Sequence, residues 1–252
     1  MVQLATLLAH LLVLFLCSDA PIRAIQGHFG VLRSMKWHPQ WRSTYYLISV
    51  LQNWLPVLLL VVICLGLGWS PQLLGLHLPT NWYLAGLVLA MGIIVIVALM
   101  LLLRLGVRDP AFRSSLSTSA STRVAASLVP RTAKERFLFA FASLTAGFCE
   151  ELLYRGFLLL YLTHLFPRIS MVLALPLAAL VFGLSHISYG RVPALLSGVA
   201  GLAYGFLYVI TGSLYLPMMV HTLYDLRILL TDWTRLLDQP GQPVEETSPP
   251  SI

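Results

Sequence analysis

Apolar runs long enough to cross a membrane follow one another along this 252-residue chain. A helix needs roughly 20 apolar residues to span about 30 Å of hydrocarbon, and a series of such runs limits the fold more than any other feature. We place spans at about residues 2–17, 46–69, 82–103, 137–165, 170–187, 193–210 and 214–230. Charged residues make up only 10% of the chain, against about 25% in soluble domains. The sequence therefore predicts an integral, multi-pass membrane protein with an all-α fold, a helical bundle of about seven spans, with a range of about six to eight.

Lys and Arg residues gather in alternate loops. Residues 18–44 contain four and residues 104–136 contain seven, whereas residues 70–81 contain none. The positive-inside rule places the basic loops in the cytoplasm, so we expect the N-terminus outside the cell and the C-terminus inside. The same rule accounts for the net charge of +6, and no nucleic-acid partner is expected.

Composition divides the chain into three parts. Residues 1–130 hold the first predicted spans and a basic, Ser- and Thr-rich cytoplasmic connector, and residues 131–237 form a core that carries the polar motifs. Residues 238–252 are rich in Pro, Ser and Glu, and we expect them to be disordered. All three cysteines fall in apolar runs without CxxC spacing, so neither a disulfide framework nor a cysteine zinc site is indicated.

Six ionisable residues fall inside the predicted spans, all in the C-terminal half. They are Glu150, Glu151, Arg155, His186, His221 and Asp225. A charge near the centre of the bilayer costs about 2.5 to 3.5 kcal/mol, so such residues are usually paired and functional. Glu151 and Arg155 are four residues apart and share a helix face, which favours a buried structural ion pair. Glu150 lies about 100° away around the helix, so we expect it to face another helix.

Two histidines join Glu150. Phe182 and His186 share one helix face, and His221 and Asp225 share another by the same spacing. A carboxylate and two imidazoles can activate water, with the carboxylate as general base and the imidazoles as metal ligands, proton carriers or oxyanion donors. A proton-coupled transporter uses the same residue types. Spacing alone leaves both interpretations open.

Three short motifs resemble those of the CPBP intramembrane proteases. EELLYR at 150–155 resembles EExxxR, FGLSH at 182–186 resembles FxxxH, and HTLYD at 221–225 resembles Hxxx(N/D). The family includes CAAX prenyl endopeptidases and bacterial bacteriocin-processing or immunity relatives. The resemblance covers about residues 135–230. It implies hydrolysis of a peptide bond within the membrane.

The resemblance also implies a role for each motif residue. Glu150 and His186 would bind and deprotonate the attacking water, and His221 and Asp225 would stabilise the oxyanion. Glu151 and Arg155 would hold the site together. Many members have Asn in the last position, and an ionised Asp225 cannot donate a hydrogen bond to an oxyanion. Asp225 would then have to be protonated, bind a metal or orient His221.

The use of a metal stays open at this point. Glu150, His186 and His221 are the ligand types of a catalytic zinc site with water in the fourth position, although the HExxH helix is absent. If Glu150 binds zinc, Glu151 or Asp225 would have to act as the base. Metal-dependent and metal-free water activation are equally supported.

We therefore expect an intramembrane endopeptidase, metal-dependent or metal-free, in a bacterial cell membrane. Its partners would be the lipid bilayer and a membrane-associated peptide or protein substrate, with or without a lipid group. The alternatives are a catalytically silent immunity or adaptor protein and a proton-coupled transporter. Small residues at Gly198, Gly201 and Gly205 favour close helix packing, with a backbone groove for an extended substrate as the alternative.

Overall fold

The computed structural model describes residues 1–28, 40–106, 108–109 and 127–230, and it is all-helical over these residues. The α-helices among these residues are α1 (Val2–His28), α3 (Trp41–Leu67), α4 (Trp82–Gly106), α7 (Ala133–Glu151), α8 (Leu159–Leu165), α9 (Met171–Ser185), α10 (Arg191–Thr211) and α11 (Tyr215–Leu226). A π-helix, η2 (Leu152–Leu158), joins α7 to α8. Short 3₁₀ turns complete the elements: η1 (Pro71–Leu74), η3 (Ile187–Tyr189) and η4 (Arg227–Leu230). The prediction of an all-α bundle is confirmed.

The predicted number of spans is not confirmed. Among the described residues, four helical stretches are long and apolar enough to cross a membrane: Trp41–Leu67, Trp82–Gly106, Ala133–Leu165 and Arg191–Thr211. Val2–Ser18 and Met171–Ser185 are shorter apolar helices. The predicted loop 18–44 is wrong at both ends, since α1 continues to His28 and α3 already begins at Trp41. A helix needs apolar residues only where it meets hydrocarbon, so it can continue beyond an apolar run.

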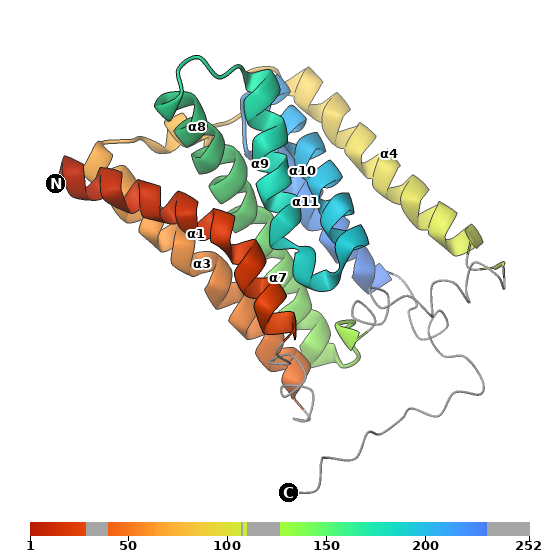
Figure 1. Cartoon of the computed structure of the whole chain (residues 1–252). Coiled ribbons are helices and arrows are strands. Elements are labelled where there is room, and N and C mark those ends of the chain that lie inside the picture. The colour runs from red at the N-terminus through yellow and green to blue at the C-terminus, as the bar shows by residue number, and fades with distance from the viewer. Residues whose placement is uncertain (29–39, 107, 110–126, 231–252) are drawn as a thin grey trace, which may run out of the picture.

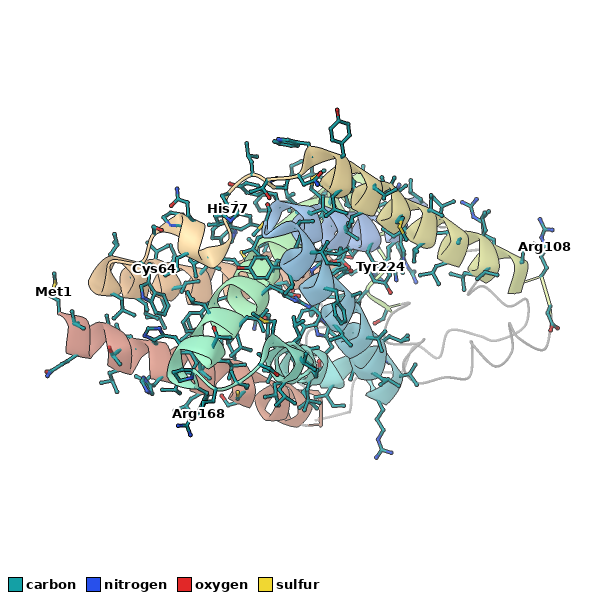
Figure 2. The ribbon with its side chains drawn as sticks, turned by 90° about the horizontal axis from the view of Figure 1, so that it is seen from above. Met1, Cys64, His77, Arg108, Arg168 and Tyr224 are labelled. Atoms are coloured by element: carbon teal, nitrogen blue, oxygen red, sulfur yellow. The ribbon has the colours of Figure 1, made fainter. Side chains whose placement is uncertain are left out.

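The helices form a bundle with one helix at its edge (Figure 1). Helices α1 and α3 lie side by side and pack against α9 and α7, while α10 and α11 complete the other side. Helix α4 packs on α11 and α10 at the periphery. Seen from above, Arg108 and Arg168 lie at the outside of the molecule and Tyr224 lies among the helices (Figure 2). This arrangement leaves α3, α7, α9 and α11 to surround the interior of the bundle.

Glycines bring the helices of the C-terminal half into close contact. A Cβ atom on Gly183 of α9 would lie 2.9 Å from the Cα atom of Gly198 on α10. A Cβ atom on Gly147 of α7 would lie 3.0 Å from the backbone nitrogen of Thr222 on α11. These approaches agree with the predicted packing role of the small residues around Gly198. They also bring α7 and α11 together at the level of the polar motifs.

The segment before α7 is fastened to α3. Thr132 and Glu135 form a capping box, in which the Thr132 hydroxyl accepts from the Glu135 N–H at 3.1 Å and the Glu135 carboxylate accepts from the Thr132 N–H at 3.1 Å. The Tyr46 hydroxyl of α3 donates to the Leu128 carbonyl at 2.6 Å, and Arg42 lies 3.8 Å from Glu135. Residues 127–136 of the predicted connector are therefore held in place. Most of the rest of the connector and the predicted tail at 238–252 lie outside the described residues.

Candidate active site

One cavity of about 870 Å³ lies between α3 and the C-terminal helices. Glu150 of α7, His186 at the end of α9, and His221 and Asp225 of α11 all line it. The structure thus brings together four of the six residues singled out from the sequence, although they come from three separate segments. Glu151 and Arg155 lie behind the wall, with side chains 0% and 2% exposed.

Glu151 and Arg155 form the predicted ion pair. The Arg155 guanidinium donates to Glu151 Oε1 at 2.8 Å and, through its other terminal nitrogen, to the carbonyl oxygen of Gly201 on α10 at 2.8 Å. The guanidinium also lies 4.3 Å from the ring centre of Phe182 on α9. Arg155 therefore connects α7, α9 and α10 through buried contacts. A pair buried this completely needs all of its partners, because a lone buried charge is strongly destabilising.

His221 is oriented from behind by the same carboxylate. Its Nδ1 lies 2.8 Å from Glu151 Oε1, and since a carboxylate held by Arg155 accepts, Nδ1 carries the proton. Its Nε2 then points into the cavity, 3.9 Å from Glu150 Oε2 and 3.7 Å from Asp225 Oδ2. The ring of Tyr204 from α10 stacks on the imidazole at 4.9 Å between centroids. The carboxylate and the stacked ring together fix the direction of Nε2.

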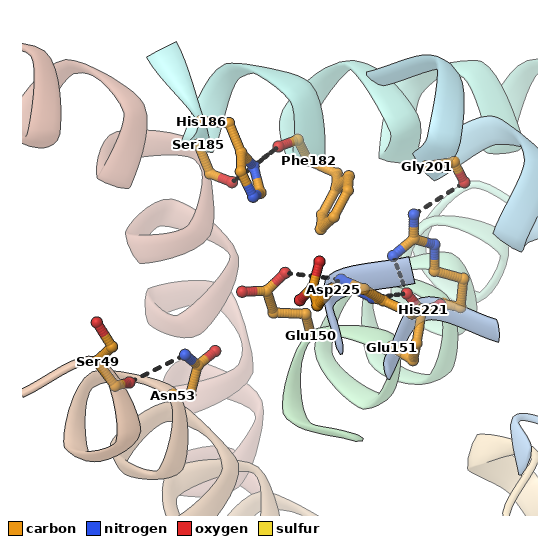
Figure 3. Close-up of polar contacts among 11 residues, drawn as sticks. Ser49, Asn53, Glu150, Glu151, Phe182, Ser185, His186, Gly201, His221 and Asp225 are labelled. Carbon is orange, nitrogen blue, oxygen red and sulfur yellow. Dashed lines mark hydrogen bonds and ion pairs between the residues drawn. The ribbon is translucent and has the colours of Figure 1, made fainter. Parts of the chain in front are cut away.

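His186 is also held in one orientation. Its Nδ1 lies 2.9 Å from the Phe182 carbonyl oxygen and 3.1 Å from the Ser185 hydroxyl. A carbonyl only accepts, so Nδ1 carries the proton in this contact, and in the neutral imidazole Nε2 keeps its lone pair. Figure 3 shows His186 on one side of the Glu150 carboxylate, with Ser49 and Asn53 of α3 on another. His186 is therefore arranged to accept a proton at Nε2.

The π-helix η2 begins directly after the Glu150 and Glu151 pair. Residues Leu152–Leu158 are all buried, and Leu153 and Tyr154 line the cavity beside Glu150. Single π-helical turns inside longer helices occur frequently at functional sites. Here the wider turn follows the two carboxylates and contains Arg155, so the predicted ion pair crosses the junction between α7 and η2.

The donor groups do not form a metal site. Among the described residues, no three His, Cys, Asp or Glu side chains are placed so that they could hold one ion. The suggested set of Glu150, His186 and His221 lines the cavity, but it is not grouped for shared coordination of zinc.

Several residues of this site are not among those predicted from the sequence. Tyr204 and the Gly201 carbonyl contact the motif residues, but ring stacking and a backbone acceptor leave no pattern in the sequence. Ser49, Gln52 and Asn53 of α3 also line the cavity. These three had a signal that could have found them, because they place polar groups inside a predicted apolar span.

One of three comparisons with known proteins found a match. A family model described as type II CAAX prenyl endopeptidase Rce1-like matches residues 132–227, about two fifths of the chain. No curated protein and no solved structure is similar enough to match. The matched segment contains all three motifs, and the predicted family is confirmed. Over residues 132–227 the chain is similar to the Rce1-like family of type II CAAX prenyl endopeptidases.

Proposed function

We propose that this protein is an intramembrane endopeptidase that hydrolyses a peptide bond of a membrane-associated substrate by side-chain activation of water. Membership of a CAAX endopeptidase family implies a protease, and apolar helices of membrane-spanning length imply an integral membrane protein. The observation that carries the mechanism is the shared cavity of Glu150, His186, His221 and Asp225.

Glu150 and His186 activate the water in this proposal. The Glu150 carboxylate and the Nε2 lone pair of His186 accept hydrogen bonds from one water, and one of them takes its proton as the water oxygen bonds to the substrate carbonyl carbon. The C–N bond then breaks, and the same proton passes to the leaving amine. Water is consumed, and a carboxyl group and an amine are formed.

His221 and Asp225 stabilise the negative charge that develops on the carbonyl oxygen. A protonated His221 donates to the oxyanion through Nε2–H, which Glu151 and Tyr204 aim into the cavity. Asp225, 3.7 Å from that nitrogen, donates as the neutral acid. Glu151 and Arg155 are positioning residues, since they act through His221 and the helices they join.

The cavity favours a hydrophobic substrate. Apart from the polar groups already named, it is lined largely by Leu, Phe, Pro, Ala and Tyr side chains from α1, α3, α7 and α10. The family description contributes a CAAX-type prenylated peptide as the first substrate to try. A bacterial cell membrane, an external N-terminus and a cytoplasmic C-terminus remain predictions from the sequence.

Glu150→Gln tests the proposed chemistry. The amide cannot act as a base, so we expect kcat to fall by about 10²- to 10⁴-fold for a fluorogenic peptide that carries a farnesylated cysteine. A palmitoylated peptide of the same sequence tests whether the prenyl group matters. Asp109→Asn changes an exposed carboxylate away from the cavity and serves as the matched control.

A silent adaptor or a transporter would give a different result. In either case the purified wild-type protein and the Glu150→Gln protein would process both peptides at the same background rate. Cleavage by the wild-type protein at no more than this background rate would remove the endopeptidase proposal, whereas unchanged cleavage above background by a folded Glu150→Gln protein would remove the role of Glu150. Protein folding is checked by size-exclusion chromatography and thermal unfolding in the same detergent.

A further inference from the structure

We propose that α3 supplies a backbone-binding wall to the cavity, in which Asn53 forms two hydrogen bonds with one peptide group of the substrate. The wall consists of Ser49, Gln52 and Asn53, which all line the cavity. It lies outside the segment that matches the family model. The inference rests on the proposed endopeptidase function, and it deepens that function by naming the groups that hold the substrate.

Asn53 lies at the depth of the catalytic carboxylate. Helices α3 and α7 run in the same direction, since Tyr46 contacts Phe139 at 5.6 Å and Trp54 stacks on Phe148 at 5.7 Å between ring centroids. Asn53 precedes Trp54, and Glu150 follows Phe148 by two residues. Since one helical turn covers 3.6 residues, the two side chains are within about one turn of the same level.

The hydrogen bonds of Asn53 leave part of its amide available. Asn53 Nδ2 donates to the Ser49 carbonyl at 3.0 Å, one turn back on the same helix. A carboxamide has two N–H donors and an oxygen that accepts. The bond to Ser49 uses one N–H, so the second N–H and Oδ1 are available to a ligand. A peptide group presents the same combination of one donor and one acceptor. Asn53 can therefore pair with a peptide group as a neighbouring strand would.

Pro56 adds a backbone acceptor to the same wall. It lies inside α3, is buried and lines the cavity. Proline has no N–H, so the carbonyl of Gln52, four residues earlier, loses its helical donor. Neutral polar groups at membrane depth are costly unless they are satisfied. The Asn53 carboxamide and the Gln52 carbonyl therefore both have hydrogen-bonding capacity left at one level of α3. A ligand that forms hydrogen bonds at this level would satisfy both groups.

An extended peptide needs such a wall. Its N–H and C=O groups lose water when they enter an apolar cavity, and each unsatisfied group weakens binding. On the opposite side, Glu150, His221 and Asp225 face the reacting bond and are committed to the chemistry. The carboxamide and carbonyl of α3 are placed to satisfy a neighbouring peptide group. The substrate would thus lie between α3 and the reactive side chains.

The test measures binding, so that it does not depend on turnover. Fluorescently labelled farnesylated peptides are bound to the Glu150→Gln protein in detergent, and each backbone N–H near the expected cleavage site is methylated in turn. We expect one N-methyl position to weaken binding roughly tenfold, the effect of one lost hydrogen bond. Asn53→Leu, added to Glu150→Gln, should weaken binding of the unmodified peptide by a similar factor. It should also abolish the extra penalty at that one position.

Two further variants separate binding from structure. Asn53→Gln keeps the carboxamide and should recover part of the affinity. Thr44→Val is the matched polar-to-apolar change on α3, because Thr44 is exposed and does not line the cavity; it should bind every peptide as the parent does. Asn53→Leu should not lower the unfolding temperature, since it removes a polar group from an apolar setting.

The proposal is overturned if the N-methyl penalties are the same with and without Asn53→Leu. It is also overturned if Asn53→Leu weakens all peptides equally while lowering the unfolding temperature, which is the result of a structural role. The endopeptidase proposal fails separately, when the wild-type protein cleaves the peptides no faster than the background rate. A coupling between Asn53 and one backbone position would stand even if the water-activating residue were a different one.

Discussion

Glu151 makes two contacts through the same oxygen atom. Oε1 accepts one hydrogen bond from the Arg155 guanidinium and one from Nδ1 of His221, each at 2.8 Å. The sequence predicts a structural ion pair at this position. The same pair also determines which nitrogen of His221 faces the cavity. The Glu151 carboxylate therefore stabilises the fold and orients His221. Because Arg155 holds this carboxylate in place, substitutions of Arg155 should lower both stability and activity.

Arg155→Ala should be among the most damaging single changes. It leaves the Glu151 carboxylate buried without its cation and the Gly201 carbonyl without its donor, which should lower the free energy of unfolding by about 3 to 5 kcal/mol. Arg155→Lys keeps the charge but cannot reach both acceptors with a planar fork, so an intermediate loss is expected. Thermal unfolding in detergent measures both. Equal stability of Arg155→Ala and the wild type would contradict the role of this pair.

Asp225→Asn tests whether Asp225 acts as a hydrogen-bond donor. A neutral acid can donate to the oxyanion and an ionised one cannot, so wild-type activity should fall as rising pH removes that proton. The amide of Asn donates at every pH. We expect Asp225→Asn to retain activity and to keep only the alkaline decline that follows loss of the His221 proton, whereas Asp225→Ala should lose about 10²-fold or more in kcat. An inactive Asp225→Asn protein would show that the ionised carboxylate is required.

At the residue scale, helix periodicity predicted the local relations but not the distant ones. The contact between Glu151 and Arg155 follows from a spacing of four residues. The spacing also separated Glu150 from this pair, and Glu150 does face the cavity. The contact between Glu151 and His221 joins positions 70 residues apart. Such a contact depends on how helices pack, and no pattern within one helix contains that information.

At the scale of elements, glycines and the π-helix set the spacing of the site. Gly147 lets α11 approach α7 closely enough for His221 to reach Glu151. Sequence patterns located the helices well, since apolar runs are a local property. They did not predict η2, because its residues Leu152–Leu158 have the composition of any apolar helix. The number of spans stays a prediction, because a helix as short as the 12-residue α11 does not by its length alone show that it crosses the bilayer.

Gly147→Ala should separate α7 from α11. Its Cβ atom would meet the Thr222 side chain and would lie 3.0 Å from the Thr222 nitrogen and 3.1 Å from the Met218 carbonyl oxygen, so the backbone has to move. We expect a loss of about 1 to 3 kcal/mol in stability together with reduced activity. Gly86→Ala on α4 is the control, since nothing lies within 4 Å of its Cβ atom. The prediction is wrong if both variants unfold at the same temperature.

At the scale of the whole molecule, we predict the orientation in the membrane from the basic loops. Residues 104–136 contain seven Lys and Arg, and the positive-inside rule assigns this segment to the cytoplasm. A reporter enzyme that is active only outside the cytoplasm should therefore be silent when fused to the C-terminus and active when fused to the N-terminus. The reverse pattern would show that the four candidate spans are arranged with the opposite topology.

The cavity is shared between the two halves of the chain. Its reactive groups come from residues 150–225, whereas the facing wall comes from α3, and Tyr46 ties that helix to Leu128 just before α7. Hydrolysis and the binding of the peptide backbone would then be encoded by different stretches of the gene. A chimaera that combined the first 130 residues of one homologue with the remainder of another should keep the reactivity of the second and take its peptide affinity from the donor of α3.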